Sequence, residues 1–509
     1  MVRETLTTPR AQRSRVLAAA EHLEGVGAMP SRLTGATVYL SGDASYLESA
    51  NGATMLRTAI RLLVRVAEQV VVSIPPTSSL DSLRRGAVDI VRDTQLESCV
   101  LIDGQAREPN DTVLWIGDRA PRDAVTVCIS SSGWRIGVWR DPVLPALRGP
   151  TNAIAATAAV ALGVAEVFKV IAGISENRRA PVVTVWSLDS LDVGAVDDGP
   201  ALPGGLNLDG ILLGGGAIGN GVILTLAELS HGIRFRGRLG IADRQVYAVE
   251  NWGTCALIGE AAIGCDKAYW LKGQLDRQLS VTAGHTFIVE AYSGLLDATI
   301  DRIEAQSYQA SISAADNGDA RRQFQTLWTD ITLDAALGET EVQVHRHTID
   351  GPSGCLRCWY EPDMRAESAE AMVERVAGIP AALQRMPEAI ISAALIARFG
   401  NDAVRKLTPF IGRKVCSVAS AATMKYLRDD VELGFTPSLP FVAVLAGAML
   451  VAEWVKHVTG QGVPMNGSWV GDVLCGPATS FTNPMKRRTA CDCVARRHVI
   501  DRTRAARGA

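Results

Sequence analysis

The sequence predicts an α/β fold in which one strand–turn–helix–strand unit occurs twice. The clearer copy lies in the middle of the chain, where an apolar run at Ile211–Leu213 leads into a triple-glycine turn, a helix-like stretch from Val222 to Leu229 and a second apolar run ending at Asp243. A weaker copy begins at Ala36. Short apolar runs bounded by turn residues indicate buried strands, and their alternation with helices indicates parallel sheets.

The glycine turn of the central copy suits a nucleotide phosphate. Gly214, Gly216 and Gly219 follow the first strand and open the helix. Glycines let the backbone approach a phosphate, and the helix N-terminus offers free N–H groups to an anion. Asp243 follows Gly219 by 24 residues, where an acid would hold a ribose hydroxyl. A tight packing turn is the alternative, but the strand, helix and acid together favour nucleotide binding.

Residues after Asp243 resemble one family of nucleotide-binding enzymes. Asn251, the segment Gly264–Lys267 and Asp316 follow in order. This arrangement resembles the adenylating domain of ubiquitin-activating enzymes and their bacterial sulfur-carrier relatives, the ThiF/MoeB superfamily. The resemblance implies an ATP site in which Asp243, Asn251 and Lys267 bind nucleotide and Asp316 binds magnesium, with Lys267 and Asp316 acting in catalysis. Thr254 stands where the family has an arginine, so positive charge must come from elsewhere, for example from Arg10, Arg13 or Arg15.

The N-terminal copy lacks the features that bind phosphate. It has no glycine loop, and no acid ends its second strand. We expect strands at Thr37–Leu40, Gln69–Ser73, Cys99–Asp103, Thr112–Ile116 and Ala124–Ser130. Helices are expected near Ala53–Val66 and Asn152–Ile171, the second broken by one glycine, and a linker at Gly194–Asp209. An ordinary α/β domain is one interpretation. The resemblance favours the other, an inactive adenylation-like copy that forms an internal pseudo-dimer with the active one.

We therefore expect two Rossmann-like adenylation-type domains, N-terminal degenerate and central active, with additions near the C-terminus. The expected parts are an inactive adenylation-like domain at 1–195, an ATP-binding domain at 205–360, a helical insert at 361–439, and a return to the adenylation domain with a zinc-binding pair and basic tail at 440–509.

Two pairs of cysteines suit a structural metal. Cys355 and Cys358 form one pair, and Cys491 and Cys493 the other. Four thiolates in two close pairs are typical of tetrahedral zinc, and the family places zinc-binding pairs at these two points. Four free thiols are the alternative.

Other cysteines are candidates for covalent chemistry. Cys416, in the insert, has basic residues around it, and a thiol at a helix N-terminus near cations becomes a nucleophile. The resemblance makes Cys416 the expected thioester residue and Cys475 the second candidate; a buried structural role is equally open for Cys416. Cys255 and Cys265 lie close to the expected nucleotide, and Cys99 and Cys128 are expected in the core.

Composition narrows the class of partner and compartment. The 509 residues carry a net charge of −3, which excludes nucleic acid as the main partner. Charges throughout residues 1–20 argue against a signal peptide, and ten cysteines without one favour a reducing cytoplasm. The apolar stretch Leu439–Val455 contains Glu453 and is expected to be a buried helix and not a membrane span. We expect solvent-facing positions for His345 and His347, for Arg321 and Arg322, and for the basic C-terminal tail.

The expected activity is ATP-dependent adenylation of the C-terminal carboxylate of a ubiquitin-like protein, followed by a cysteine thioester and transfer to a conjugating enzyme. The implied cofactors are ATP, Mg²⁺ and Zn²⁺. The chain is expected to act as a monomer or a homodimer. The resemblance further implies a place in ubiquitin-like conjugation operons, some linked to antiviral defence. Alternatives are an adenylyltransferase for a sulfur-carrier protein without a thioester step, an NAD-dependent oxidoreductase, and a catalytically inactive binding partner.

Overall fold

A computed structural model describes most of the chain as two compact units. The larger unit comprises Met1–Glu361 with Pro437–Ala509, and the smaller comprises Pro362–Thr436. The described residues are 14–23, 29–94, 99–103, 107–140, 145–174, 184–294, 296–360, 374, 378–386, 389–415, 418 and 438–506.

The first half of the larger unit is built on a seven-stranded mixed sheet of order β3-β2-β1-β4-β5-β6-β7. Strands β1 to β5 pair in parallel, and β6 and β7 are antiparallel. The strands are β1 Thr37–Gly42, β2 Gln69–Val72, β3 Val100–Ile102, β4 Thr112–Ile116, β5 Val125–Ser132, β6 Arg135–Arg140 and β7 Thr184–Ser187.

The second sheet has eight strands in the order β10-β9-β8-β11-β12-β13-β14-β15. They are β8 Gly205–Leu213, β9 Arg234–Asp243, β10 Thr286–Ser293, β11 Ala310–Ser313, β12 Ile331–Leu337, β13 Glu341–Thr348, β14 Gly467–Asp472 and β15 Phe481–Asn483. Counted from its own first strand, each sheet reads 3-2-1-4-5-6-7, and the second adds an eighth strand. The α/β fold is confirmed, and the repeated order is consistent with two Rossmann-like domains.

Helices cover these sheets and connect their parallel strands. In the first half they are α2 Ser14–His22, α3 Pro30–Leu33, α4 Ala44–Leu47, α5 Ala50–Val66, η2 Ser78–Leu80, α6 Asp81–Asp93 and α7 Ala153–Ala172. In the second they are α8 Ala217–Leu229, η3 Val249–Asn251, η4 Glu260–Ala262, α9 Lys267–Val281, α10 Leu296–Glu304, α11 Gly318–Phe324, η5 Gln325–Leu327, α12 Leu356–Trp359, α18 Pro440–Thr459, η7 Pro477–Thr479, α19 Asp492–Ala495 and α20 Arg497–Ala506.

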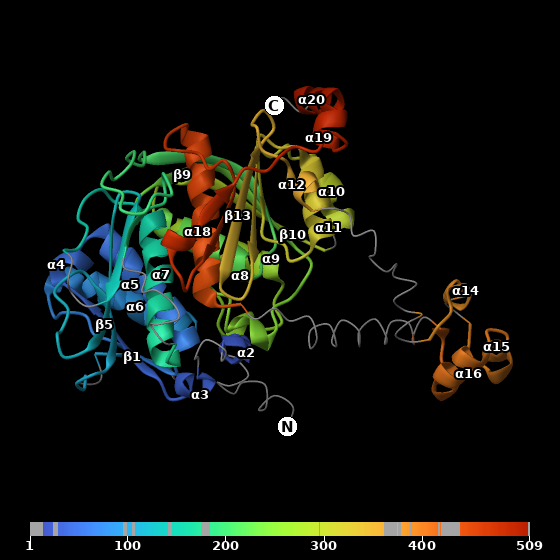
Figure 1. Cartoon of the computed structure of the whole chain (residues 1–509), viewed down its shortest axis with the longest axis horizontal. Coiled ribbons are helices and arrows are strands. Elements are labelled where there is room, and N and C mark those ends of the chain that lie inside the picture. Colours follow the sequence, from blue (N-terminus) through green and yellow to red (C-terminus); the bar gives the residue numbers. More distant parts are fainter. Residues whose placement is uncertain are drawn as a thin grey trace. The chain divides into compact units, whose positions relative to one another are not determined.

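Two long apolar helices, α7 and α18, pack together between the sheets (Figure 1). Each is long and apolar enough to cross a membrane. However, 94% of the most apolar 18-residue stretch of α7 and 89% of that of α18 are buried in the protein. Burial by the two sheets therefore accounts for their composition. This agrees with the buried helix expected at Leu439–Val455.

The two central helices also carry matching buried ion pairs. Glu166 pairs with Lys169 in α7, and Glu453 pairs with Lys456 in α18 at 2.6 Å. Lys169 Nζ donates to the carbonyl of Leu474, after β14, at 3.0 Å. Lys456 Nζ donates to the carbonyl of Asp189, after β7, at 2.8 Å. Each half thus holds a turn of the other half in an equivalent way.

Two expectations about these elements need correction. Gly163 does not break α7, which is continuous; the glycine instead lets the helix approach β5, because a Cβ there would lie 2.4 Å from Ile129 Cγ2. The expected linker Gly194–Asp209 is too long, because β8 begins at Gly205.

Several of the basic residues near the C-terminus are held against the fold and do not form a solvated tail, although Arg496 and Arg502 are exposed as expected. Arg487 donates to the carbonyl of Ile349 at 2.8 Å, and Arg497 donates to the same carbonyl at 2.9 Å. Arg504 forms an ion pair with Asp330. These arginines fasten the C-terminal segment to the loops before β12 and after β13.

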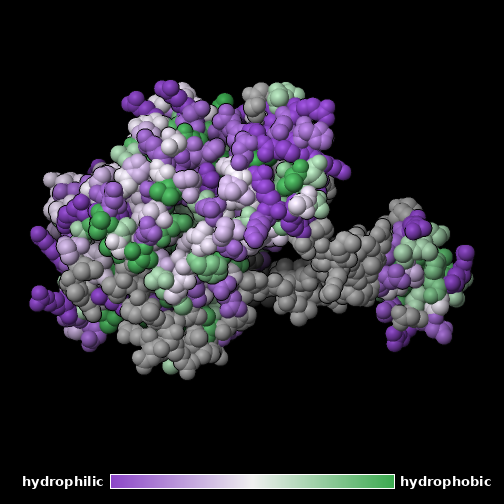
Figure 2. All heavy atoms as spheres, turned by 45° about the horizontal axis from the view of Figure 1, so that its top comes forward, coloured by the Kyte–Doolittle hydropathy of each residue, from purple (hydrophilic) through white to green (hydrophobic). Residues whose placement is uncertain are grey.

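The smaller unit is helical where it is described, in agreement with a helical insert. It contains α14 Ala381–Gln384, α15 Ala393–Ala397, α16 Asn401–Leu407 and the turn η6 Thr408–Phe410. Its own apolar core includes Ile379, Leu383, Ile391, Ile396 and Leu407. On the face of the larger unit drawn in Figure 2, hydrophobic residues are scattered among hydrophilic ones.

Candidate active site

The glycine loop lies between β8 and α8, at the carboxyl edge of the second sheet. Gly214 has a φ of +99°, and its N–H donates to the carbonyl of Ala242 at 2.8 Å. A Cβ at Gly214 would lie 2.6 Å from the carbonyl oxygen of Ala314. Glycine is needed here for both reasons, because side chains disfavour this φ and the neighbouring backbone leaves no room. The loop is therefore held between the ends of β9 and β11.

Asp243 ties this loop to β9. Its Oδ2 accepts the N–H of Gly215 at 2.6 Å, and its Oδ1 accepts the N–H of Gln245 at 2.7 Å. A carboxylate has about four acceptor positions, so two remain for a ligand hydroxyl.

Lys267 lies directly beside the loop, as the first residue of α9. Its Nζ donates to Gln245 Oε1 at 2.7 Å and lies 5.7 Å from the centre of the Tyr247 ring. A Cβ at Gly215 would lie 2.9 Å from Lys267 Cβ. The side chain is buried, so its charge is weakly screened by water.

Two residues that the sequence did not single out fix the loop from beneath. Asn220 is fully buried in α8, and its Nδ2 donates to the carbonyls of Gly215 and Gly216 at 3.0 and 2.9 Å. The hydroxyl of Tyr247 donates to the same Gly215 carbonyl at 2.8 Å, and burial raises the pKa of Tyr247 well above its usual value. An amide within an apolar helix was the available signal for Asn220; for Tyr247 there was none.

The N-terminus of α8 is open to an anion. Gly216 is its N-cap and supplies no side-chain hydrogen bond to the first turn. The first N–H groups of a helix carry partial positive charge, and an anion beside them is stabilised. Together with Lys267, this gives the loop a positive electrostatic character.

Asn251 and Thr254 lie in a packed turn beyond the loop. Asn251 Oδ1 accepts the N–H of Ala248 at 2.9 Å, so the side chain closes its own turn, η3. Thr254 is 1% exposed, at the position where the family has an arginine. Helix α2, which carries Arg15, packs against η3. Arg10 and Arg13 lie outside the described residues.

Asp316 is exposed and follows the end of β11 by three residues. Its neighbour Asn317, and not Asp316, is the N-cap of α11. The expectation that Arg321 faces solvent is wrong, and Arg322 is half-buried. Arg321 is buried and donates to the carbonyl of Ala315 at 2.8 Å and to Asp334 at 2.9 Å, while Arg322 donates to the carbonyl of Tyr360 at 2.6 Å. Arg321 therefore fixes the backbone that leads into Asp316.

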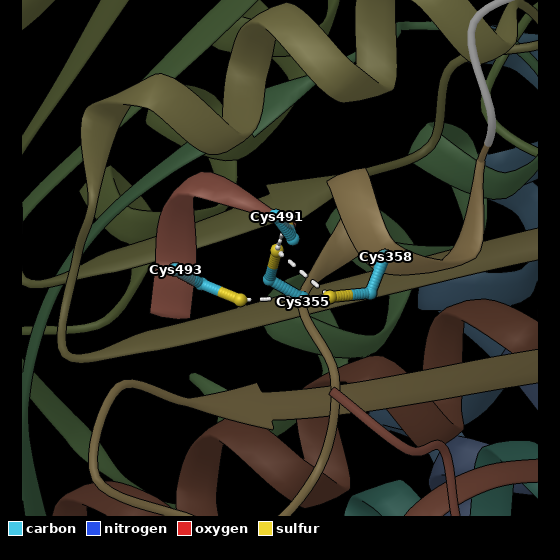
Figure 3. Close-up of side chains that lie close together, drawn as sticks. All are labelled: Cys355, Cys358, Cys491 and Cys493. Carbon is cyan, nitrogen blue, oxygen red and sulfur yellow. Dashed lines mark hydrogen bonds between the residues drawn. The ribbon is translucent and has the colours of Figure 1, made fainter. Parts of the chain in front are cut away.

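The four paired cysteines meet in one buried cluster (Figure 3). Their sulfur atoms all lie within 4.8 Å of one another. Cys355 Sγ lies 3.6 Å from Cys491 Sγ, and Cys358 Sγ lies 3.5 Å from Cys493 Sγ. Sulfurs bound tetrahedrally to zinc at ~2.3 Å would lie ~3.8 Å apart. The geometry therefore fits a zinc ion.

Within this cluster, hydrogen bonds between the thiols lower the pKa of Cys358 and Cys491, whereas the pKa values of Cys355 and Cys493 are raised. The thiol of Cys355 lowers the pKa of Cys491 to about 6. The N–H of Arg488 donates to Cys358 Sγ at 3.4 Å, and the pKa of Cys358 is lowered, chiefly by the Cys355 thiol. Thiolates are the form that binds metal.

His345 and His347 are both 1% exposed, so the expected solvent-facing position is wrong. The segment Ser353–Trp359 covers their face of β13: His345 Nε2 lies 3.0 Å from the Gly354 carbonyl, and His347 Nδ1 lies 2.9 Å from the Ser353 carbonyl. The alternation correctly placed both rings on one face but could not show what covers it.

The remaining cysteines occupy different environments. Cys416 lies outside the described residues. Cys475 is half-buried in the turn after β14, Cys255 is buried in the turn beyond Asn251, and Cys265 is half-buried before α9. Cys99 and Cys128 are buried, which confirms their expected place in the core.

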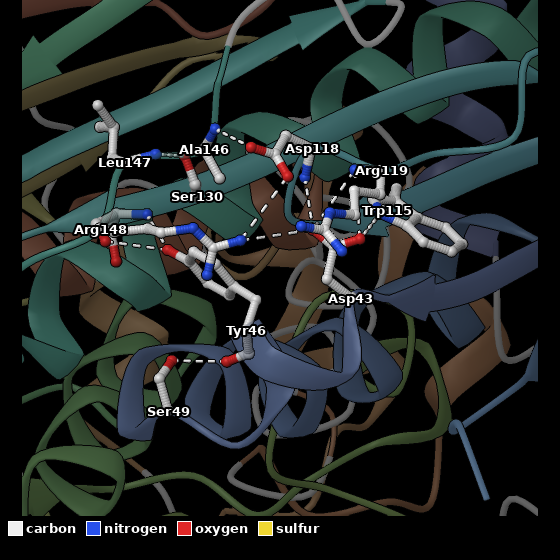
Figure 4. A network of polar contacts seen from close by, with 11 residues as sticks. Asp43, Tyr46, Ser49, Trp115, Asp118, Arg119, Ser130, Ala146, Leu147 and Arg148 are labelled. Carbon is white, nitrogen blue, oxygen red and sulfur yellow. Dashed lines mark hydrogen bonds and ion pairs between the residues drawn. The ribbon is translucent and has the colours of Figure 1, made fainter.

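The N-terminal sheet has a different structure at the edge equivalent to the glycine loop (Figure 4). Asp43 directly follows β1, as Gly214 directly follows β8. Its Oδ2 accepts the N–H of Asp118 at 2.9 Å, and its Oδ1 accepts Trp115 Nε1 at 3.2 Å. A Cβ at Gly117, after β4, would lie 2.2 Å from Asp43 Oδ2. A buried carboxylate thus lies where the other half has an open glycine turn.

Comparison with known proteins gives similarities of several kinds. Residues 37–184 match the family described as the BilD N-terminal domain. Over 462 residues the chain is 27% identical to the uncharacterized protein y4jF of Sinorhizobium fredii (strain NBRC 101917 / NGR234), covering 86% of this chain and 84% of that protein.

Similar solved structures include Escherichia coli MccB with ATP, at a TM-score of 0.36 and 14% identity over 57% of this chain and 67% of MccB. MccB with N-formylated MccA gives a TM-score of 0.35 and 15% identity over 57% and 67% of the two chains. PaaA gives a TM-score of 0.33 and 15% identity over 54% of this chain and 73% of PaaA. None of these similarities by itself assigns an activity.

Proposed function

We propose that this protein uses ATP to adenylate the C-terminal carboxylate of a ubiquitin-like protein. One observation carries the proposal: Asp243 and Lys267 are held against a glycine loop at the uncapped N-terminus of α8. A triphosphate needs close backbone approach, N–H donors and a cation, and this edge of the sheet supplies all three.

The residues of the site would divide the work by position. The N–H groups of α8 and the ammonium of Lys267 stabilise negative charge on the phosphates, and Asp243 accepts a ribose hydroxyl. The exposed carboxylate of Asp316 would hold Mg²⁺, which prefers oxygen ligands and neutralises phosphate charge. The substrate carboxylate attacks the α-phosphorus, the bond to the bridging oxygen breaks, and an acyl-adenylate and pyrophosphate form. Catalysis here is positioning and electrostatic stabilisation.

We infer that a cysteine then receives the acyl group. The thiolate of Cys416 attacks the acyl carbon, AMP leaves with the electron pair, and the resulting thioester passes to a conjugating enzyme. A thioester keeps the acyl group reactive after ATP has been consumed. Cys475 is the second candidate; the turn that contains it follows β14, four strands from β8 in the sheet.

The N-terminal half serves as an inactive copy in this proposal. The carboxylate of Asp43 directly follows β1, where the active copy has its glycine loop, and its negative charge opposes a phosphate there. One nucleotide per chain is expected, and Asp43 is the reason.

ATP–pyrophosphate exchange tests the adenylation step. With a candidate ubiquitin-like partner ending in glycine, Lys267→Ala should lower the exchange rate by roughly 100-fold, because one preorganised charge at the phosphates is lost. Lys272→Ala is the matched control, since Lys272 lies on the same helix but pairs with Asp276. Equal rates for both variants would contradict the proposal, and binding of NAD without ATP would favour an oxidoreductase.

A second experiment tests the thioester. The wild type should form an adduct with the partner that dithiothreitol removes, and Cys416→Ser should abolish it while Cys475→Ser keeps it. Exchange activity with no such adduct would instead indicate a sulfur-carrier adenylyltransferase.

A further inference from the structure

The two halves differ in the segment between the second strand and the next long helix. In the first half this connection is residues 73–80, between β2 and α6; in the second it is residues 244–266, between β9 and α9. The longer connection rests on the N-terminal half. A Cβ at Gly259 would lie 2.2 Å from the carbonyl oxygen of Thr94. We call residues 244–266 the nucleotide-site connection, because they carry Tyr247 and Asn251 and end at the N-cap of α9.

Arg65, in the last turn of α5, enters this connection from the N-terminal half. Its side chain is fully buried, and its Nη2 donates to the carbonyls of Cys255 and Ile258, both at 2.8 Å. Its Nε donates to Cys255 as well, at 3.1 Å. The guanidinium carbon lies 5.1 Å from the centre of the Trp252 ring. A planar guanidinium can satisfy two carbonyls at fixed geometry in a way that few other side chains can.

These contacts continue as a path of hydrogen bonds to the glycine loop. Between the two carbonyls that Arg65 holds, the N–H of Leu257 donates to Asn220 Oδ1 at 3.1 Å. That bond sets the orientation of the Asn220 amide, whose Nδ2 donates to the carbonyls of Gly215 and Gly216. Each step joins buried groups, and buried polar groups keep their partners because losing one is costly.

We propose that Arg65 is a positioning residue for the nucleotide site, so that the N-terminal half sets the affinity of its partner half for ATP. This inference rests on the proposed function, since it assumes that the glycine loop binds ATP. Without the guanidinium, the carbonyl of Ile258 loses this donor and that of Cys255 keeps the N–H of Ile258, at 3.4 Å. The Leu257 segment then shifts, and the amide beneath the loop loses its fixed orientation. Arg65 touches no substrate in this scheme.

The full-length protein tests this with three variants of α5. Arg65→Met removes the donors and keeps much of the apolar length; Arg65→Lys keeps a charge but not the planar fork. Arg57→Met is the matched control, because Arg57 also joins the halves through an ion pair to Glu228 at 2.5 Å but does not touch the connection. Binding of ATP with Mg²⁺ is measured by calorimetry, and KM for ATP and kcat are measured by pyrophosphate exchange.

We expect Arg65→Met to raise the dissociation constant and KM for ATP by about tenfold or more, with a smaller effect on KM for the protein partner. Arg65→Lys should be intermediate, and Arg57→Met close to wild type in KM. Hydrogen exchange of residues 246–258 should be faster in Arg65→Met alone.

The outcomes separate the two proposals. A wild type that binds no ATP ends the proposed function. A wild type that binds ATP, with Arg65→Met binding equally well or no worse than Arg57→Met, overturns the role of Arg65. If Arg65→Met fails to fold, Arg65→Lys decides, and unchanged ATP affinity in that variant overturns the inference.

Discussion

His347 is a buried histidine whose pKa lies below its usual value. Burial, together with the charge of His345, lowers its pKa to about 4. In the unfolded chain a histidine titrates near ~6.5. As pH falls, the unfolded state therefore binds its proton first. The stability that neutral His347 contributes is complete above pH ~6.5 and is lost progressively as pH falls to about 4.

We predict that His347→Gln flattens this dependence. Between pH ~6.5 and about 4, the free energy of unfolding of the wild type should fall by at most roughly 3 kcal/mol because of this one group, at ~1.4 kcal/mol per pH unit. Urea unfolding of both proteins between pH 7.5 and 4.5 measures how the free energy of unfolding depends on pH. Excess zinc is present throughout, so that any loss of metal affects the wild type and the variant alike. Parallel curves for the two proteins would contradict the prediction.

Cys491 tests the metal at the cysteine cluster. We predict about one zinc per chain in the wild type by elemental analysis, and little or none in Cys491→Ser, because three thiolates bind structural zinc far more weakly than four. The free energy of unfolding should fall by several kcal/mol, since metal binding contributes to folding. Cys265→Ser is the control, as Cys265 lies outside the cluster. Full zinc content in Cys491→Ser would rule out this ligand set.

At the scale of elements, α8 and α18 cross at two glycines. A Cβ at Gly447 would lie 2.3 Å from the carbonyl carbon of Gly221, and a Cβ at Gly221 would lie 2.7 Å from the carbonyl oxygen of Ala443. Both obstacles are backbone atoms, which cannot rotate away. The crossing therefore depends on the absence of side chains at both positions.

We predict that Gly447→Ala destabilises the protein by about 1–3 kcal/mol, the usual range for overpacking. Gly273→Ala is the control, because Gly273 lies within α9 with open space around its Cβ. That change should stabilise by roughly 0.5–1 kcal/mol through helix propensity. Thermal unfolding measures both, and a stabilised Gly447→Ala would show that the helices can separate at little cost.

At the scale of the whole molecule, part of the fold could be predicted from the sequence. Apolar runs of strand length located β1, β4, β8 and β9, and the glycine turn located the loop, since these signals are local. The four cysteines lie together as expected: the close spacing within each pair is local, and the family resemblance implied that the two pairs share one site. Arg65 and Asn220 were missed, and Arg321 was expected at the surface, because their main partners are backbone carbonyls. The carbonyls that Arg65 holds lie far along the chain, and Asp334, which pairs with Arg321, follows a turn. Hydrophobic periodicity does not record such contacts.

The matched lysines of α7 and α18 predict how the two halves unfold. Lys456→Met would leave Glu453 buried without its lysine, and Lys169→Met would do the same to Glu166; each change also frees a carbonyl in the opposite half. Each glutamate keeps an arginine partner, Arg346 for Glu453 and Arg140 for Glu166, so the cost should lie below the roughly 3–5 kcal/mol of an unpaired buried charge. Because each lysine joins the halves, both variants should lower one shared cooperative transition in calorimetry, whereas Lys272→Met, on the exposed side of α9, should leave it unchanged. Two separate transitions, each lowered by only one variant, would mean that the halves unfold independently and that the ion pairs stabilise only their own helices.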